Sequence, residues 1–261
     1  MPLPKFAVRA AARVKPLVPA SLWPTLLATR SLLGDGAILA PAPTGRVLTL
    51  SAHPDDDTIG CAGTLALSVL GGAEVTAAMA TSGGASIGTA LSAAQLMAAR
   101  EADARRAYNH LGVHDVRFLG LPDGGVEARA ADLRLALDRL VAEVNPDVIF
   151  VPWALDAHRD HRAVHRALLG IELDPRLQIW SYETWTPLPP NRHVDITPVA
   201  ATKQAALAEH HTAGQAFDLT ALAALSRYRS AHALMGRGEA EGFLVGSPDE
   251  LRSIVAQVDA G

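Results

Sequence analysis

Residues 46–63 read RVLTLSAHPDDDTIGCAG and combine a strand signal, a helix signal and a dense run of charge. The apolar and β-branched residues of 46–52 predict a buried strand, and residues 58–72 predict a helix that ends at glycines. His53 and three consecutive aspartates at 55–57 lie at their junction. Neighbouring carboxylates repel one another and are rarely buried without partners. The stretch is therefore either a solvated acidic turn or a place where a cation sits among the acids.

The rest of the chain repeats this alternation of short β-branched runs with longer Ala- and Leu-rich stretches. Such alternation is typical of βαβ units. We predict an α/β, Rossmann-like fold, with a mostly parallel sheet flanked by helices on both faces. Further strands are expected over 74–81, 115–122, 146–153 and 177–185, and helices over 89–112, 129–144, 198–211 and 218–235.

Composition excludes several classes of protein. The chain has 261 residues, of which 49% are hydrophobic and 19% are charged, which is too apolar for a disordered chain. A formal net charge of -4 gives no general attraction to nucleic acid. The single cysteine, Cys61, rules out an internal disulfide framework and favours a reducing compartment, so we expect a cytoplasmic protein. No apolar run of the sequence is long enough to span a bilayer.

The first 45 residues differ from the rest, and we divide the chain into an N-terminal arm and linker over 1–45 and a main domain over 46–261. The arm is basic at its start and contains no acid before Asp35. Two interpretations stay open. The arm packs its apolar residues on its own domain or on a second subunit, or it forms a basic amphipathic helix that lies on an anionic membrane surface.

A second polar cluster, DAHRDHRAVH at 156–165, follows the predicted strand 146–153. The carboxyl ends of parallel strands line the ligand crevice of an α/β sheet, so both clusters are expected at the same edge. Imidazole and carboxylate are zinc ligands, and catalytic zinc sites use three of them. A neighbouring carboxylate that is not a ligand can then take a proton from water.

Structural explanations compete with this interpretation. Asp56 or Asp57 can cap the following helix, because aspartate is a common N-cap residue. His161 and His165 are spaced four residues apart and can form a solvated helix face. The arginines within 156–165 can pair with its acids on the surface. Trp153, Trp180 and Trp185 can line a sugar-binding groove or pack in the core.

Both clusters resemble the motifs of a known family, the PIG-L/LmbE family of zinc-dependent de-N-acetylases. AHPDDDTIGCAGTLA at 52–66 resembles its AHPDDE signature, and DAHRDHRAVHRAL at 156–168 resembles its second motif, with a His-x-Asp-His core. Weaker matches follow in the expected order, so that the resemblance covers about residues 46 to 245. These are TSGGASIG at 81–88, READARRAYNHLG at 100–112, LGLPDGGV at 119–126, KQAALAEHHTAGQ at 203–215 and AEGF at 240–243.

The resemblance implies a role for each matching residue. His53, Asp56 and His161 look like the ligands of a Zn²⁺ ion, although Fe²⁺ or Mn²⁺ suits such a site as well. Asp55 looks like the general base, His158 matches the group that stabilises the oxyanion or protonates the leaving amine, and Asp160 would orient His158. Arg100 and Asp123 match positions that contact the sugar.

The chain departs from the family pattern in three places. Asp57 and Asp103 stand where glutamate is usual. Asp156 and Ala157 precede His158, where relatives of the thiol pathway have a tyrosine, which argues against a close functional match to those enzymes.

The expected function is hydrolysis of the N-acetyl group of a small-molecule or glycoconjugate substrate that contains N-acetylglucosamine. Two alternatives stay open: an amidase of the same family that acts on another amide, such as a thiol conjugate or a longer acyl group, and a non-catalytic sugar- or nucleotide-binding module. The N-terminal arm is the expected place for a peripheral membrane contact or an oligomer contact.

Overall fold

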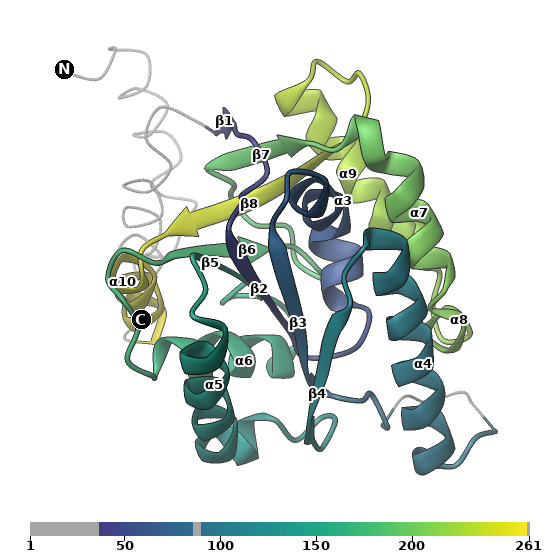
Figure 1. Cartoon of the computed structure of the whole chain (residues 1–261), viewed down its shortest axis with the longest axis vertical. Coiled ribbons are helices and arrows are strands. Elements are labelled where there is room, and N and C mark those ends of the chain that lie inside the picture. The colour runs from purple at the N-terminus through teal and green to yellow at the C-terminus, as the bar shows by residue number, and fades with distance from the viewer. Residues whose placement is uncertain (1–36, 86–89, 260–261) are drawn as a thin grey trace, which may run out of the picture.

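A computed structural model describes residues 37–85 and 90–259 of the chain. Its centre is an eight-stranded sheet in the order β1-β7-β8-β6-β5-β2-β3-β4 (Figure 1). Every pairing is parallel except those of β8, which runs antiparallel to both β6 and β7. The strands are β1 (Ile38–Leu39), β2 (Arg46–Ser51), β3 (Glu74–Thr81), β4 (Asp115–Leu121), β5 (Val148–Pro152), β6 (Gln178–Tyr182), β7 (Arg192–Asp195) and β8 (Ala240–Gly246).

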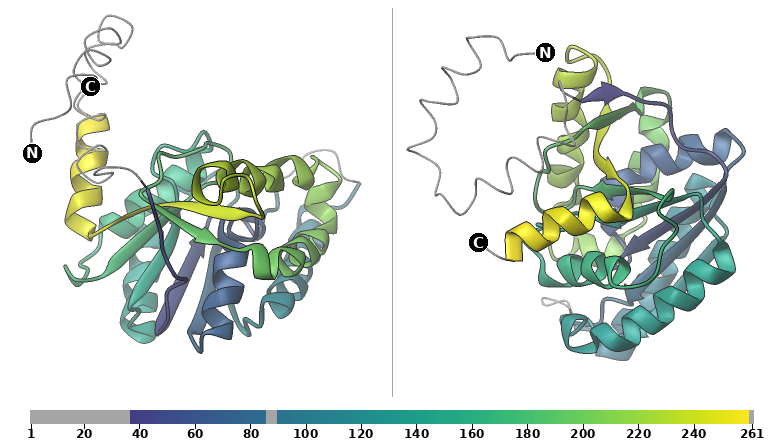
Figure 2. Two further views of the ribbon diagram at one scale, coloured as in Figure 1. Left: turned by 90° about the horizontal axis from the view of Figure 1, so that it is seen from above. Right: turned by 90° about the vertical axis from the view of Figure 1, so that its left-hand side faces the viewer.

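Helices cover both faces of this sheet, as the sequence predicts (Figure 2). One face is packed by α3 (Asp56–Leu70), α4 (Ala93–Leu111) and α7 (Ala200–Ala208), and the other by α5 (Ala130–Val144), α6 (Arg159–Leu169) and α10 (Pro248–Asp259). The short α8 (His211–Gly214) and the longer α9 (Leu219–Ala233) lie beyond α7, and two 3₁₀ turns, η3 (Glu127–Arg129) and η4 (Thr197–Val199), precede α5 and α7.

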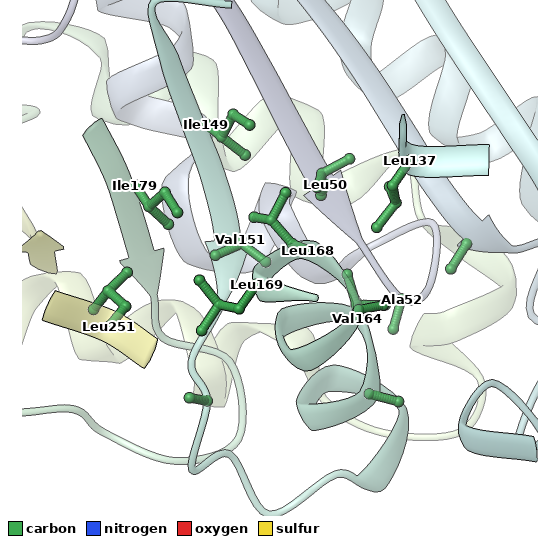
Figure 3. Packing of buried hydrophobic residues seen from close by; sticks show 14 of the residues in the cluster. Leu50, Ala52, Leu137, Ile149, Val151, Val164, Leu168, Leu169, Ile179 and Leu251 are labelled. Carbon is green, nitrogen blue, oxygen red and sulfur yellow. The ribbon is translucent and has the colours of Figure 1, made fainter. Parts of the chain in front are cut away.

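Strand residues alternate between the two cores because successive side chains of a strand point to opposite faces. In β2, Leu48 and Leu50 pack with α5 and α6, whereas Val47 packs with α3 and α4. Figure 3 shows the first of these clusters, in which Leu50 and Ile149 of the central strands meet Val164 and Leu168 of α6. Both faces of the central strands are thus buried, which explains their continuous apolar runs.

Most predicted elements are present, with ends that shift by a few residues. The strand predicted at 74–81 is β3 itself, and the helix predicted at 58–72 begins two residues earlier, at Asp56. The predicted ranges include none for β1, β7, β8, α6 or α10. Within β8, only residues 240–243 stand out in the sequence, as a motif, because a seven-residue stretch interrupted by Glu241 and Gly242 has no clear periodic signal of its own.

β1 lies within the segment predicted as arm and linker, and it pairs with β7. The basic part of the predicted arm falls in residues 1–36, outside the described residues. Within 37–85 and 90–259, none of the helices has the length and apolar character needed to cross a membrane.

The order of the strands fixes where a ligand can bind. The chain runs outward from β2 to β3 and β4, then returns to β5 on the other side of β2. In open α/β sheets, ligands bind at the carboxyl ends of the strands where the order reverses in this way. Here that switch point lies between β2 and β5, the two strands followed by the clusters at His53 and His158.

Candidate metal centre and active site

The turn after β2 is held by the first helical residues that follow it. Asp56 Oδ2 accepts hydrogen bonds from the backbone N–H groups of Ala52 and His53, at 3.0 and 2.7 Å. Asp57 accepts from the hydroxyls of Thr49 and Tyr108 inside the core. An N-cap side chain accepts from the N–H groups of the first turn of its own helix. Asp56 instead accepts from backbone N–H groups before the helix, and Asp57 accepts from side chains, so neither makes the capping contact considered as an alternative.

The turn after β5 is organised by Asp156 and by the start of α6. Asp156 Oδ1 accepts from the backbone N–H of His158 and lies 3.0 Å from His161 Nδ1, while its Oδ2 accepts from the backbone N–H groups of Trp185 and Thr186. His158 is the N-cap of α6, and its Nδ1 accepts from the backbone N–H of Asp160 at 3.2 Å. Both imidazoles that follow β5 therefore have a fixed orientation.

The two turns bring their side chains together. His161 Nε2 lies 3.3 Å from His53 Nδ1 and 3.1 Å from Asp56 Oδ1, and His53 Nδ1 lies 3.4 Å from Asp56 Oδ2. His158 lies beside them, and each of the three histidines offers a nitrogen within 4.8 Å of the other two. All four side chains are buried or half-buried.

The outer nitrogens of His53 and His161 each face a carboxylate. His53 Nε2 lies 3.1 Å from Asp123 Oδ1, and His161 Nδ1 lies 3.0 Å from Asp156 Oδ1. A carboxylate that faces a neutral imidazole favours the tautomer with its proton on that side. Two lone pairs then face each other across 3.3 Å, an arrangement that a cation between them would stabilise. Ligand atoms of a tetrahedral zinc site are separated by about this distance, given Zn–N bonds of about 2.0–2.1 Å.

The electrostatics of the site also favour positive charge between these groups. Burial alone would lower the pKa of His53 and His161, but the neighbouring carboxylates outweigh burial and raise the pKa of His53 well above its usual value and that of His161 to about 9. Burial alone would raise the pKa of Asp56, but His161 and His53 lower it well below its usual range. The donor set therefore fits a divalent metal ion.

Asp55, the predicted general base, has a different partner from Asp56. Its Oδ1 lies 2.9 Å from an Nη atom of Arg100, and both side chains are almost fully buried. Arg100 and Asp123, expected to contact a sugar, thus pair with Asp55 and with His53, and both also line the pocket beside them.

Asp160 and His165 lie differently from what the sequence analysis expected. The Asp160 carboxylate accepts from the backbone N–H of Gly124 and lies 3.6 Å from His53 Nε2, so the Asp160 group that orients His158 is the backbone amide. His165 is fully buried rather than on a solvated helix face, and its Nδ1 lies 2.8 Å from the carbonyl oxygen of Pro152.

The pocket over these groups has a volume of about 290 Å³. Its outer wall contains Trp185, which is 42% exposed, and Phe217, whose ring centroid lies 5.1 Å from that of Trp185. Trp153 and Trp180 are buried in the core instead. No signal in the sequence points to Phe217, and Asp156 belongs to the second polar cluster without an assigned role.

Comparison with known proteins supports the family suggested by the two motifs. The PIG-L family model, described as GlcNAc-PI de-N-acetylase, matches residues 48–171. Three curated relatives resemble the chain: the uncharacterized deacetylase YaiS of Escherichia coli (29% identity), a probable N-acetyl-alpha-D-glucosaminyl L-malate deacetylase of Bacillus anthracis (33%) and a 1D-myo-inositol 2-acetamido-2-deoxy-alpha-D-glucopyranoside deacetylase of Geodermatophilus obscurus (37%). The matches cover 58%, 47% and 49% of this chain, and 80%, 57% and 52% of those proteins. The chain thus spans only about half the length of the last two.

Solved structures share the fold. The conserved protein TT1542 from Thermus thermophilus is 28% identical, with a TM-score of 0.66 over 78% of this chain and 95% of that one. The 4-carboxy-2-hydroxymuconate hydratase GalB from Pseudomonas putida (19% identity, TM-score 0.67) covers 78% and 96%, and the N,N'-diacetylchitobiose deacetylase from Pyrococcus horikoshii (22%, 0.66) covers 95% of both. One fold thus carries a hydratase and a deacetylase, so fold alone does not decide the reaction.

The stretch matched by the family model contains both polar clusters, which meet at the switch point of the sheet. Over residues 48–171, the chain matches the PIG-L (LmbE-like) deacetylase family.

Proposed function

We propose that this chain is a metal-dependent N-deacetylase that hydrolyses the acetamide of an N-acetylglucosamine-containing substrate. The observation that carries the proposal is the pair of imidazole nitrogens that face each other across 3.3 Å beside Asp56, with a separate buried carboxylate, Asp55, in the same pocket. This arrangement supplies a metal site and a proton acceptor that is not needed as a ligand.

His53, Asp56 and His161 would hold the ion, through His53 Nδ1, His161 Nε2 and a carboxylate oxygen of Asp56. When bound, a divalent cation acts as a Lewis acid that polarises the amide carbonyl and makes water a better nucleophile near neutral pH. Asp123 and Asp156 contact the two imidazoles from their outer sides, so that the inner nitrogens would be the ones that face the ion.

Asp55 is the proton acceptor in this mechanism. It takes a proton from the attacking water as the water oxygen bonds to the acetyl carbon. Arg100 restrains the Asp55 carboxylate through a buried contact of 2.9 Å, so that the base keeps one position.

His158 acts on the tetrahedral intermediate and on the departing amine. Because its Nδ1 accepts from the backbone N–H of Asp160, a neutral His158 carries its proton on Nε2. That N–H can donate to the oxygen of the tetrahedral intermediate or to the departing amine. The proton that Asp55 took from water passes to the leaving nitrogen as the C–N bond breaks, and acetic acid and a free amine result.

The curated relatives with named substrates act on N-acetylated glucosaminides, which supports this substrate class. Trp185 and Phe217 form an aromatic wall of the pocket, and such faces suit the apolar side of a sugar ring. A different amide within the same family is the alternative, because the catalytic groups act on the amide and do not recognise the rest of the substrate.

The test is acetate release from a panel of N-acetylglucosaminides, with protein that has been stripped of metal and then given Zn²⁺, Fe²⁺ or Mn²⁺. We expect metal-dependent release, and we expect Asp55→Asn to lower kcat by about 10²–10⁴-fold while the protein still binds metal. If folded, metal-loaded protein releases no acetate, the proposal of an N-acetylglucosamine-containing substrate is overturned. Panels of N-acyl amides and thiol conjugates would then identify the amide.

A further inference from the structure

A second cavity, of about 260 Å³, lies between η3, the start of α5 and the outer side of α6. Four arginines line it: Arg134 of α5, and Arg159, Arg162 and Arg166 of α6. Glu127 is the only acidic residue that lines it in the described part of the chain. We propose that this cavity, here called the arginine pocket, binds an oxyanion: the phosphate or carboxylate group of a ligand.

The arginines keep most of their charge uncompensated. Arg162 donates to the backbone carbonyls of Asp156 and Ala157, which carry no formal charge, and Arg134 donates to a carbonyl of its own helix. Arg159 forms no hydrogen bond or ion pair with any residue that the structure describes. Among the residues that the structure describes, Arg166 alone has an acidic partner, Asp259. Like charges that share a small cavity repel one another, and a bound anion would relieve this repulsion.

Two local features favour an anion in this pocket. Arg159 is the first residue of α6, where the helix dipole favours negative charge and disfavours a cation. The Nε atom of Arg166 is buried, and it has no hydrogen-bond partner within residues 37–85 and 90–259. A buried donor without an acceptor is costly. Phosphate and carboxylate groups match guanidinium geometry, and the cavity has room for either one with several water molecules.

The arginine pocket lies next to the candidate active site. Arg159 follows His158 in the chain, and an Nη atom of Arg159 lies 3.2 Å from where a Cβ would stand on Gly124. Gly124 follows Asp123, which lines the catalytic pocket. The turn that contains Asp123 and Gly124 therefore separates the two cavities. The oxyanion can come from two sources, a charged aglycone of the substrate that extends over this turn or a free anion.

The first test measures binding of inorganic phosphate by calorimetry, which requires no catalytic activity. The double variant R134Q/R159Q removes two charges that have no acidic partner in the described part of the chain. As a control, Arg139→Gln removes one charge from α5 outside the pocket. We expect phosphate to bind the wild type and the R139Q control equally, and R134Q/R159Q at least about tenfold more weakly. Equal affinity in all three proteins, or no binding to the wild type, would overturn the proposal.

The second test shows whether the oxyanion belongs to the substrate or is a free anion, and it rests on the proposed deacetylase function. It compares N-acetylglucosaminides that differ only in a carboxylated or an uncharged aglycone. If the anion belongs to the substrate, R134Q/R159Q raises KM severalfold for the carboxylated compound and leaves kcat and the uncharged compound unchanged. If the anion is free, KM changes equally for both compounds or for neither. A failure of catalysis would leave the phosphate result standing, so the two proposals fail separately.

Discussion

Asp55 and Asp56 are adjacent in the chain, yet their carboxylates face different partners. Asp56 accepts two backbone N–H bonds and contacts His53 and His161, whereas Asp55 pairs with Arg100. This separation follows from their positions at the start of α3, where consecutive residues point about 100° apart. One carboxylate is thereby directed to the metal centre, and its neighbour is left beside it as a proton acceptor.

The two aspartates should therefore differ in metal binding. We expect Asp56→Asn to weaken Zn²⁺ binding by at least about tenfold, because it removes a charged ligand and one acceptor of the turn. Asp55→Asn should bind Zn²⁺ as the wild type does. Metal content after dialysis against a chelator series measures both. Equal retention of metal by D56N and the wild type would contradict the ligand role of Asp56.

At the scale of elements, a buried ion pair connects α3 to the rest of the fold. Lys203 of α7 donates to Glu241 of β8 at 2.7 Å and to the carbonyl of Ile59, and Glu241 accepts from the N–H groups of Gly63 and Thr64. Both side chains are about 2% exposed or less. The helix that carries Asp56 is therefore fixed by α7 and β8, which follow it by more than a hundred residues.

Removal of one partner of this pair should be costly. Lys203→Met leaves Glu241 buried without its cation, so we expect the free energy of unfolding to fall by about 3–5 kcal/mol. The double variant K203M/E241Q should recover part of this loss, because it leaves no uncompensated charge. Urea unfolding of the wild type, K203M and K203M/E241Q measures the loss of stability and its partial recovery. A cost below about 1 kcal/mol for K203M would argue that the pair contributes little.

The buried contact of His165 between α6 and β5 makes the stability of the fold depend on pH. Burial lowers the pKa of His165 to about 4, against an ordinary value of 6.5. Between these values the unfolded chain binds a proton that the folded protein does not. The contribution of His165 to stability is thus complete above about pH 6.5 and is lost as the pH falls toward 4, by about 1.4 kcal/mol per pH unit.

We therefore expect His165→Asn, which keeps a donor for the Pro152 carbonyl, to lose less stability than the wild type on going from pH 7 to pH 4.5. The difference should be about 2–3 kcal/mol by urea unfolding in the presence of a chelator. His193, whose pKa is also lowered to about 4 by burial, is present in both proteins and cancels in the comparison. Parallel pH profiles for the two proteins would contradict the prediction.

At the scale of the whole molecule, a metal ion would join two halves of the sheet. His53 follows β2 and His161 lies in α6 after β5, 108 residues further along the chain. Ligand that binds only the folded state stabilises it by about 2.7 kcal/mol at a hundredfold excess over Kd.

We expect Zn²⁺ to raise the melting temperature of metal-stripped protein by about 5–10 °C, and His53→Ala to abolish this rise. Asp55→Asn should keep it, because Asp55 is not among the proposed ligands. Scanning calorimetry with and without Zn²⁺ measures the effect. A rise of the same size in H53A would place the bound ion elsewhere.

Much of the architecture could be predicted from the sequence, because hydrophobic periodicity and glycine positions are local signals. They predicted the strands β2 to β6, the helices α3, α4, α5, α7 and α9, and the two polar segments at strand ends. β8 was missed because its strand character depends on antiparallel pairing with β6 and β7, which no local pattern records.

By itself, the sequence determined the class of fold, the two clusters and the chemical types at the site. Only the tertiary structure decided the pairs within it: Asp55 with Arg100, His53 with Asp123, and His161 with Asp156. The first two of these pairs join residues 45 and 70 positions apart. Contacts of that range depend on how the strands are ordered and how the turns close over them. Periodicity predicts each element, but only the packed sheet determines which charged groups become neighbours.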